Sequence, residues 1–450
     1  MALGSIAKMS LLQSGRLPFP RLVGYALGAF GTGVFSTVPT VLLLYFCTET
    51  LRISPVLAGL AVFLPKAWAL VWDPFVGVWS DRTRTRIGRR RPFMLAGAIG
   101  VSLAFVALFS WPYPRGFPAF VLVSLIYFAL ANAYSLFAVP FIAVPAEISP
   151  SPAERERVTA WRIGLAMVGV LIGAGLAPML VEWGGGGRAG YRVMALVVAG
   201  LCGVGMLSTF FATPSRLGGE MSSGAPPSLA QCFAALRRSP AFLKLALAYV
   251  IQLTGIGLIS ALTPYWIVTV AGRNAGDSGL ALGVMLIATI LSTPIWAWAM
   301  RRVGARGGIA VAAALYGLAT LSFLALPIHG GPWIFAVYGL IGIPFAGLQV
   351  GPFALAAHLI HDAAERLDAR QEGLFTGLWT AGEKLGLALG PGMAGLGLAT
   401  IGFVSGAGTN TPAVAGHLTW LIAGGPTAFL WASLLFLRGP KNASPPPSVS

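Results

Sequence analysis

Long apolar stretches, separated by short segments rich in glycine, proline and charge, make up most of this chain. Each stretch reaches the ~20 mostly apolar residues that a helix needs to cross a bilayer. The pattern predicts a first set of six membrane-spanning helices near residues 22–47, 55–79, 93–111, 119–144, 158–181 and 191–212. A second set of six is predicted near residues 241–271, 278–300, 307–326, 332–358, 374–401 and 417–437. We therefore expect an all-α, polytopic membrane protein with twelve transmembrane helices in two six-helix bundles.

The longest polar connection in the chain lies between the two sets of helices. It runs from Thr213 to Pro240 and is rich in serine, glycine and proline, a composition typical of linkers. We expect an N-terminal bundle over residues 1–212, a cytoplasmic linker loop over residues 213–240, and a C-terminal bundle over residues 241–450 that ends in a short cytoplasmic tail.

The overall composition supports the membrane class. Hydrophobic residues make up 56% of the chain, charged residues only 10%, and the mean hydropathy is +0.79. Soluble domains carry roughly 25% charged residues. The chain has 3 cysteines, an odd number without paired spacing, which favours neither a disulfide framework nor a zinc site. We expect no metal site and no cofactor.

The net charge of +16 would suggest nucleic-acid binding in a soluble protein, but the basic residues are distributed as in a membrane protein. If both termini are cytoplasmic, 23 of the 30 basic residues lie on the cytoplasmic side and five on the opposite side, while Lys66 and Lys384 lie inside spans. Such asymmetry sets the orientation of membrane proteins. We expect a monomer in a bacterial inner membrane, with both termini cytoplasmic, that contacts lipid and a small-molecule solute and binds no nucleic acid.

An internal repeat relates the two predicted bundles. "DPFVGVWSDR", which begins at Asp73, matches "TPIWAWAMRR", which begins at Thr293, at an offset of 220 residues. "RIGLAM", which begins at Arg162, matches "KLGLAL", which begins at Lys384, at an offset of 222 residues. Transporters built from two related halves repeat their motifs in this way. The repeat therefore indicates a secondary transporter.

Charged residues inside the predicted spans are candidate site residues, because a charge at the bilayer centre costs ~2.5–3.5 kcal/mol on insertion scales. Asp73 lies eight residues, or ~12 Å, from Asp81 at the cytoplasmic end of its span. We interpret Asp73 as a cation-coupling acid; the structural alternative is a pair with a neighbouring helix. Glu383 is a candidate replacement acid. It points about 100° away from Lys384, so the two side chains do not share a face.

Other residues in the spans are candidates for contact with a solute. Lys384 and Arg162 are related by the repeat, and each either binds the solute or belongs to a charge pair. Tyr25 and Trp379 are candidates for stacking against a solute, although most such aromatic residues pack helices or anchor them at the interface. For Lys66 we expect its ammonium to extend toward the membrane interface.

A basic loop follows the second predicted span. It contains six arginines between positions 82 and 91 and acts first as a determinant of topology. Its second role is that of a conformational latch, in which arginines pair with acids such as Asp81. The predicted gating residues are Asp81, Arg82, Arg89, Arg90 and Arg91.

The segment "WDPFVGVWSDRTRTRIGRRRPFMLAG", Trp72 to Gly97, resembles the signature of the glycoside-pentoside-hexuronide:cation symporters. These are the melibiose-permease-like branch of the major facilitator superfamily, and "GRRRPF" resembles plant sucrose transporters more distantly. "YALGAFGTG" and "GLWTAGEKLGLALG" extend the likeness. The resemblance implies a major facilitator fold and cation-coupled carbohydrate symport by alternating access. It also implies that Asp73 is the cation-site acid, and that Lys384 and Arg162 occupy positions used for substrate or coupling.

The sequence departs from this family at three acidic positions, where it has Ala69, Gly33 and Ala138. Sodium usually requires several oxygen ligands, whereas one carboxylate can carry a proton. We therefore expect H⁺ as the coupling ion, with Na⁺ as the alternative. Whether the lost acids mean a solute other than a sugar stays open.

The preferred interpretation is a symporter of a sugar, glycoside or related small organic solute. One alternative is an exporter or uniporter of an amphiphilic solute, which the lost acids favour. A second is a transport-inactive membrane sensor or assembly protein. No hydrolase triad or nucleotide-binding loop is evident in the sequence, so we do not expect an enzyme.

Overall fold

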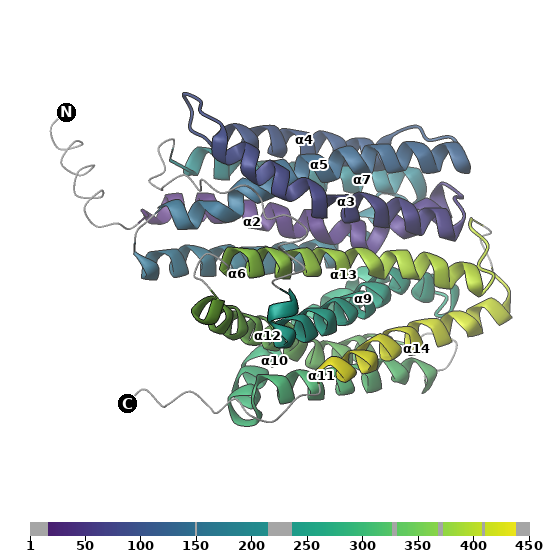
Figure 1. The fold of residues 1–450 in the computed structure, drawn as a ribbon. Coiled ribbons are helices and arrows are strands. Elements are labelled where there is room, and N and C mark those ends of the chain that lie inside the picture. The colour runs from purple at the N-terminus through teal and green to yellow at the C-terminus, as the bar shows by residue number, and fades with distance from the viewer. Residues whose placement is uncertain are drawn as a thin grey trace. The chain divides into compact units, whose positions relative to one another are not determined.

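The computed structural model of this chain describes residues 17–148, 151–214, 236–325, 331–367, 372–406 and 410–437. Twelve long helices account for most of these residues, which contain no strand (Figure 1). The all-α, polytopic architecture expected from the apolar stretches is confirmed. The predicted linker, residues 213–240, lies outside the described residues except at its two ends.

The first set of helices begins with α2, Phe19–Val38, which continues through two π-helical segments, η1 at Pro39–Leu43 and η2 at Phe46–Thr50. The helices that follow are α3 at Pro55–Arg82, α4 at Arg91–Ser110, α5 at Phe117–Ile148, α6 at Pro152–Trp183 and α7 at Gly187–Ala212. A π-helical turn inserts an extra residue into a helix and is frequent at functional sites.

The second set comprises α9 at Pro240–Thr269, α10 at Asp277–Val303, α11 at Ala305–Leu321 with the 3₁₀ turn η3 at Ser322–Ala325, α12 at Ile334–Leu367, α13 at Glu372–Thr400 and α14 at Pro412–Leu437. In the described residues, eleven helices are long and apolar enough to cross a membrane. The remaining long helix, α13, carries Glu383 and Lys384 within a glycine-rich sequence.

The chain forms two compact units. The first consists of Met1–Leu43 and Leu64–Pro226, and the second of Leu44–Phe63 and Pro227–Ser450. Helix α3 therefore belongs to the second unit in its first turns and to the first unit from Leu64 onward. The structure groups residues 44–63 with the second unit, and the boundaries of the two bundles given by the sequence stay a prediction.

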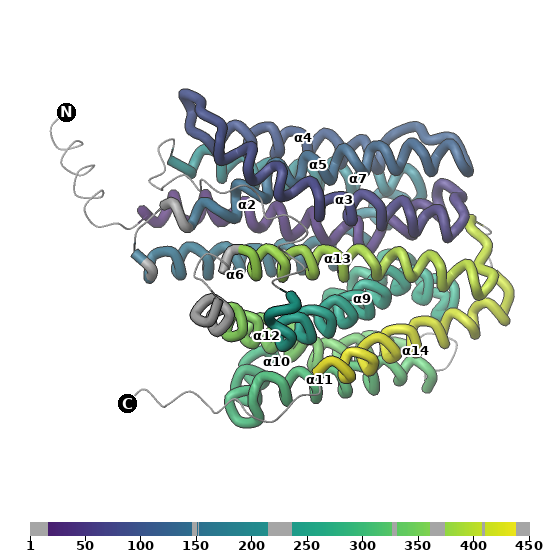
Figure 2. The backbone as a smooth tube through the Cα atoms, in the orientation of Figure 1, coloured from purple at the N-terminus to yellow at the C-terminus, as the bar shows by residue number. Residues whose placement is uncertain are grey.

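Several helix pairs of the first unit have a counterpart in the second, and Figure 2 traces the backbone of these helices. In the first unit α2 packs against α6 and α7, and α4 packs against α5 and α7. In the second unit α9 packs against α13 and α14, and α11 packs against α12 and α14. The repeated motifs obey this correspondence, because Asp73 and Thr293 lie on the second helices while Arg162 and Lys384 lie on the fifth.

Glycines set a close helix crossing in the first unit, between α2 and α6. A Cβ added at Gly33 would meet the carbonyl oxygen of Ala166, and a Cβ at Gly169 would meet the carbonyl oxygen of Phe30. A Cβ at Gly173 would lie 2.9 Å from the carbonyl oxygen of Val34. Gly169 and Gly173 form a G-x-x-x-G pair, the spacing that lets helix backbones approach closely in a membrane.

Polar contacts attach residues 44–63 to the rest of the second unit. The hydroxyl groups of Thr48 and Tyr265 are hydrogen-bonded at 2.7 Å. Ser405 donates to the Ile53 carbonyl oxygen at 2.8 Å, and the Gly406 N–H donates to the Glu49 carboxylate at 3.3 Å. Burial raises the pKa of Glu49, and the hydrogen bonds from Gly406 and Thr48 oppose that rise.

The first turns of α3 also pack against α13, at a helix crossing formed by glycines. A Cβ at Gly59 would lie 3.0 Å from the carbonyl oxygen of Gly392 and 3.2 Å from the Cα of Gly395. Helices α3 and α13 therefore touch backbone to backbone at this point. Because such contact leaves no space for a side chain, the crossing fixes the path of α3 before it enters the first unit.

Candidate functional site

Asp73 lies in α3, immediately before one of two prolines inside that helix, Pro65 and Pro74. Proline at 74 removes the backbone N–H that would have bonded to the carbonyl of Leu70, so the helix backbone is locally less constrained beside the acid. Asp73 is half-buried. The position one turn earlier on the same face is Ala69, so no second carboxylate accompanies Asp73 on this helix face.

Lys66 lies on the face of α3 that also carries Ala69 and Asp73, two turns before the acid. Its ammonium donates a hydrogen bond of 2.7 Å to the Thr40 hydroxyl. Thr40 belongs to the π-helical segment η1, and its own hydroxyl donates to the Ser36 carbonyl oxygen at 2.9 Å. The basic side chain expected at the membrane interface is therefore bonded to a hydroxyl on the neighbouring helix.

Tyr25 is fully buried in α2. Its hydroxyl donates to the Phe141 carbonyl oxygen at 2.7 Å, and its ring packs against the Phe141 ring at a centroid distance of 4.8 Å. Arg162, half-buried on α6, lies within electrostatic range of the Tyr25 hydroxyl. In this conformation the ring of Tyr25 packs α2 against α5, and its contact with a solute stays a prediction.

Trp379 on α13 belongs to an aromatic cluster in the second unit. Its ring stacks on Tyr249 with a centroid distance of 4.4 Å and an interplanar angle of 5°. Phe353 contacts Trp379 edge-on at 5.9 Å. Only 6% of Trp379 is exposed, whereas 44% of Phe353 is exposed. The more accessible aromatic surface of this cluster is therefore Phe353, which the sequence did not single out.

Glu383 and Lys384 lie one turn further along α13 and are both half-buried. Glu383 is within electrostatic range of the Tyr249 hydroxyl on α9. The backbones of α9 and α13 approach closely, because a Cβ at Gly390 would lie 2.6 Å from the Cα of Gly257. This crossing holds the two charged residues beside the aromatic cluster, and their roles in coupling and solute binding stay predictions.

The basic loop is tied to the first unit by two arginines. Arg90 forms an ion pair of 2.8 Å with Asp81, and its side chain is only 8% exposed. Arg91 donates to the Phe210 carbonyl oxygen at 3.1 Å, and its guanidinium lies 4.4 Å from the centroid of the Phe210 ring. Arg82 is exposed and Arg89 half-buried. The structure thus pairs two of the predicted gating residues, Asp81 and Arg90, and the latch itself stays a prediction.

Packing leaves no room for a side chain at Gly33, one of the positions where the resemblance would place an acid. Gly33 faces the backbone of α6 at Ala166 and Val170, where even a methyl group would collide. Ala138 on α5 is 4% exposed. A carboxylate at Gly33 would need a wider spacing between α2 and α6.

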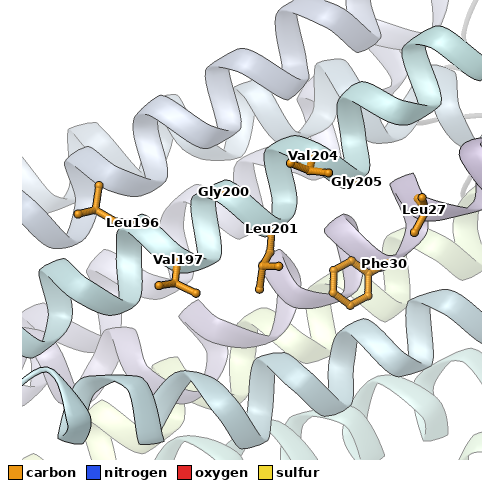
Figure 3. Close-up of a pocket in the computed structure, with 8 residues that line it drawn as sticks. All are labelled: Leu27, Phe30, Leu196, Val197, Gly200, Leu201, Val204 and Gly205. Carbon is orange, nitrogen blue, oxygen red and sulfur yellow. The ribbon is translucent and has the colours of Figure 1, made fainter.

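An apolar pocket of about 380 Å³ lies between α2 and α7 in the first unit (Figure 3). It is lined by Leu27, Phe30, Leu196, Val197, Gly200, Leu201, Val204 and Gly205. None of these side chains can form a hydrogen bond, so the pocket cannot recognise the hydroxyl groups of a sugar. We do not assign the solute site to it.

The hydrogen bond between Lys66 and Thr40 was not predicted from the sequence. Its signal was present as a row of hydroxyl residues, Ser36, Thr37 and Thr40, near the end of a mostly apolar helix. A threonine in a membrane-spanning helix commonly bonds to the carbonyl four residues earlier, which makes such a row a weak signal until a partner is known.

Comparisons with known proteins agree with this architecture. The sequence matches the family described as MFS/sugar transport protein over residues 24–438. The putative glycoside/cation symporter YagG of Escherichia coli is 35% identical over 205 residues, which cover 45% of this chain and 44% of the relative. The isoprimeverose transporter of Lactiplantibacillus pentosus is 25% identical over 410 residues, which cover 88% of this chain and 83% of the relative.

A solved structure shares the fold. It is the crystal structure of a bacterial homologue of the human lysosomal transporter Spinster, in an inward-facing and unoccupied conformation. The TM-score is 0.68 at 14% sequence identity, and the match covers 93% of this chain and 94% of that one.

Proposed function

Because this chain belongs to the MFS/sugar transport protein family, it is a multi-pass membrane transporter and not an enzyme, and we propose that it carries a glycoside or related sugar in symport with a proton. The observation that carries the proposal is Asp73, a half-buried acid within a membrane-spanning helix. A charge at such a depth is costly and marks ion and proton pathways in transporters.

The choice of a proton over sodium follows from the residues around Asp73. Sodium would require further oxygen ligands, and the position one turn earlier is Ala69. A single carboxylate can bind and release a proton without a complete coordination shell. In alternating access, protonation of Asp73 accompanies loading of the solute, and deprotonation on the other side of the membrane resets the carrier.

Thermal melting of the purified protein tests the solute class. We expect isoprimeverose or methyl β-D-glucoside to raise the melting temperature, since a ligand at ~100 times its Kd stabilises the folded state by about 2.7 kcal/mol. The detergent must lack a sugar head group, because a maltoside would itself occupy a sugar site. Lysophosphatidylcholine serves as the amphiphile for comparison.

Stabilisation by the lysolipid alone would overturn the sugar assignment. It would favour the alternative of an exporter or uniporter of an amphiphilic solute, which the absence of acids at Ala69, Gly33 and Ala138 supports. The sequence-based alternative of a transport-inactive sensor would be favoured by the absence of stabilisation by any of these compounds.

We further propose that both termini and the loop containing Arg89 face the cytoplasm of a bacterial cell, because this orientation places most basic residues on the cytoplasmic side. An Arg89→Cys variant in intact cells should resist a membrane-impermeant maleimide and react with it only after the membrane is permeabilised. The natural Cys47 and Cys202 are buried, and Cys232, which lies outside the described residues, is replaced by serine in parent and variant so that it adds no background. Strong labelling of the Arg89→Cys variant in intact cells would contradict the proposed orientation and place this loop outside the cytoplasm.

A further inference from the structure

One face of α10 exposes a continuous row of large apolar side chains. Their spacing of three and four residues places them on the same face of the helix. The row consists of Leu280, Val284, Ile287, Leu291, Ile295 and Trp298. The exposed fraction of each residue lies between 36% and 71%. Because α10 is a membrane-spanning helix, the surroundings of this row are lipid chains.

Hydrogen bonds to α12 fix the direction in which the row faces. Trp296 donates to the Ile343 carbonyl oxygen at 2.7 Å, and Thr289 donates to the Gly342 carbonyl oxygen at 3.0 Å. Both donors are buried and lie on the face of α10 opposite the apolar row. The helix therefore cannot turn the row inward without breaking these two contacts.

Arginine continues the row at the end of α10. Arg302 lies one turn beyond Trp298, and its guanidinium is 5.1 Å from the centroid of the Trp298 ring. Such a contact is attractive because the face of the ring carries partial negative charge. Tryptophan in membrane proteins is enriched at the level of the lipid head groups. The apolar row thus ends in a positive charge at the depth where head groups lie.

In the part of the chain that the structure describes, no carboxylate pairs with the arginines at this end of α10. The repeat with an offset of 220 residues aligns Arg301 with Asp81, the acid that pairs with Arg90 in the first unit. Arg301 and Arg302 are both exposed, and neither forms an ion pair with a described residue. Both guanidinium groups are therefore available to an anion from outside the chain.

The length of the row corresponds to one leaflet of a bilayer. Leu291 precedes Arg302 by eleven residues, which is ~16 Å along the helix axis, or about half of a hydrocarbon core of ~30 Å. A phospholipid whose head group meets Arg302 would therefore have its acyl chains beside Trp298, Ile295 and Leu291.

These features match the two parts of an anionic phospholipid. Arginine binds phosphate through two parallel hydrogen bonds, and the acyl chains are as apolar as the row. We propose that α10 binds an anionic phospholipid, with its phosphate at Arg301 and Arg302 and its acyl chains along the row from Leu291 to Trp298. A role in membrane topology needs only the positive charge of these arginines and does not account for the contact with Trp298. The inference depends neither on the solute nor on the coupling ion.

The test titrates the purified full-length protein with two lipids that have the same dioleoyl chains, and native mass spectrometry measures the bound lipid. Phosphatidylglycerol carries a net negative charge, whereas phosphatidylcholine has the same phosphate but no net charge. We expect the parent protein to bind phosphatidylglycerol about tenfold more tightly, because each arginine near the membrane surface favours an anionic lipid. This comparison needs no variant, so it does not depend on the folding of a mutant protein.

Double variants then locate the charges that are recognised. Arg301→Gln/Arg302→Gln should bind the two lipids with nearly equal affinity, while Arg301→Lys/Arg302→Lys should keep a preference for phosphatidylglycerol. The matched control is Arg237→Gln/Arg238→Gln, which removes two adjacent, exposed arginines that precede α9. This control should retain the preference of the parent protein.

Equal affinity of the parent for the two lipids, or an unchanged preference in Arg301→Gln/Arg302→Gln, would overturn the inference. An equal loss of preference in the control would attribute the preference to total charge and would overturn it as well. Displacement of phosphatidylglycerol by an equal concentration of glycerol 3-phosphate would assign the arginines to a free phosphate ester. A dimer that forms without lipid and becomes a monomer in Leu291→Arg would assign the row to a second copy of this chain.

Discussion

Gly169→Ala is expected to destabilise the protein by about 1–3 kcal/mol, the usual cost of forcing an extra methyl group into a packed interior. The added Cβ would meet the carbonyl oxygen of Phe30 and would lie 3.0 Å from the backbone nitrogen of Val34. Both atoms belong to the backbone of α2, which cannot rotate away as a flexible side chain would. Helices α2 and α6 would have to separate along their whole crossing, so we expect transport to fall as well.

Gly164→Ala is the matched control, because it makes the same chemical change on the same helix. A Cβ at Gly164 would meet no atom within 4 Å. Alanine is also the better helix former by about 1 kcal/mol, so this variant should melt at or above the temperature of the parent. Equal melting temperatures for the two variants would contradict this prediction, because they would show that the α2–α6 crossing has room for a methyl group at Gly169.

The apolar pattern predicted the helical type of the described residues, and eleven of their twelve long helices meet the apolar criterion for a membrane span, while α13 is the one that falls short of it. A bilayer demands ~20 apolar residues per span and permits no unpaired backbone, so hydrophobicity alone determines most of the secondary structure. The repeat at Asp73 and Thr293 likewise predicted related helices, and the structure gives both units the same pairing order. The helices and the repeat can be predicted from local sequence, because each of these features depends on the residues of a single helix.

The path of residues 44–63 could not be predicted in this way. The sequence gives no sign that Thr48 meets Tyr265, or that Gly59 lies against Gly392, because these contacts join residues hundreds of positions apart. The contact of Lys66 with Thr40 was missed for a related reason. It depends on the π-helical turns of η1, which change the direction of the side chains that follow them.

The candidate site was only partly accessible to sequence reasoning. Asp73 could be identified because a carboxylate in an apolar span is rare and costly. Tyr25 and Trp379 were predicted to stack against a solute because their side chains are aromatic. The type of ring does not show whether other side chains of the protein already cover its faces. The structure covers one face of Trp379 with Tyr249 and buries Tyr25 completely. Burial of this kind is decided by neighbouring helices and is not visible in a single segment.

Asp73→Asn is expected to abolish accumulation of the solute against its gradient. The amide has nearly the same size as a protonated carboxylate, so insertion and folding should be preserved. It cannot release a proton, however, and the carrier would be held permanently in its protonated form. The inside concentration of solute should then rise no higher than the outside concentration, while exchange of solute across the membrane continues.

Proton movement driven by the solute tests directly whether Asp73 couples the transport of the proton to that of the solute. The parent and Asp73→Asn proteins are reconstituted separately in weakly buffered proteoliposomes, and the glycoside that stabilises the parent most is added outside. The external medium should become more alkaline with the parent, because protons enter with the solute, and its pH should not change with Asp73→Asn. Solute uptake by the parent without proton movement, or proton uptake that persists in Asp73→Asn, would contradict this coupling.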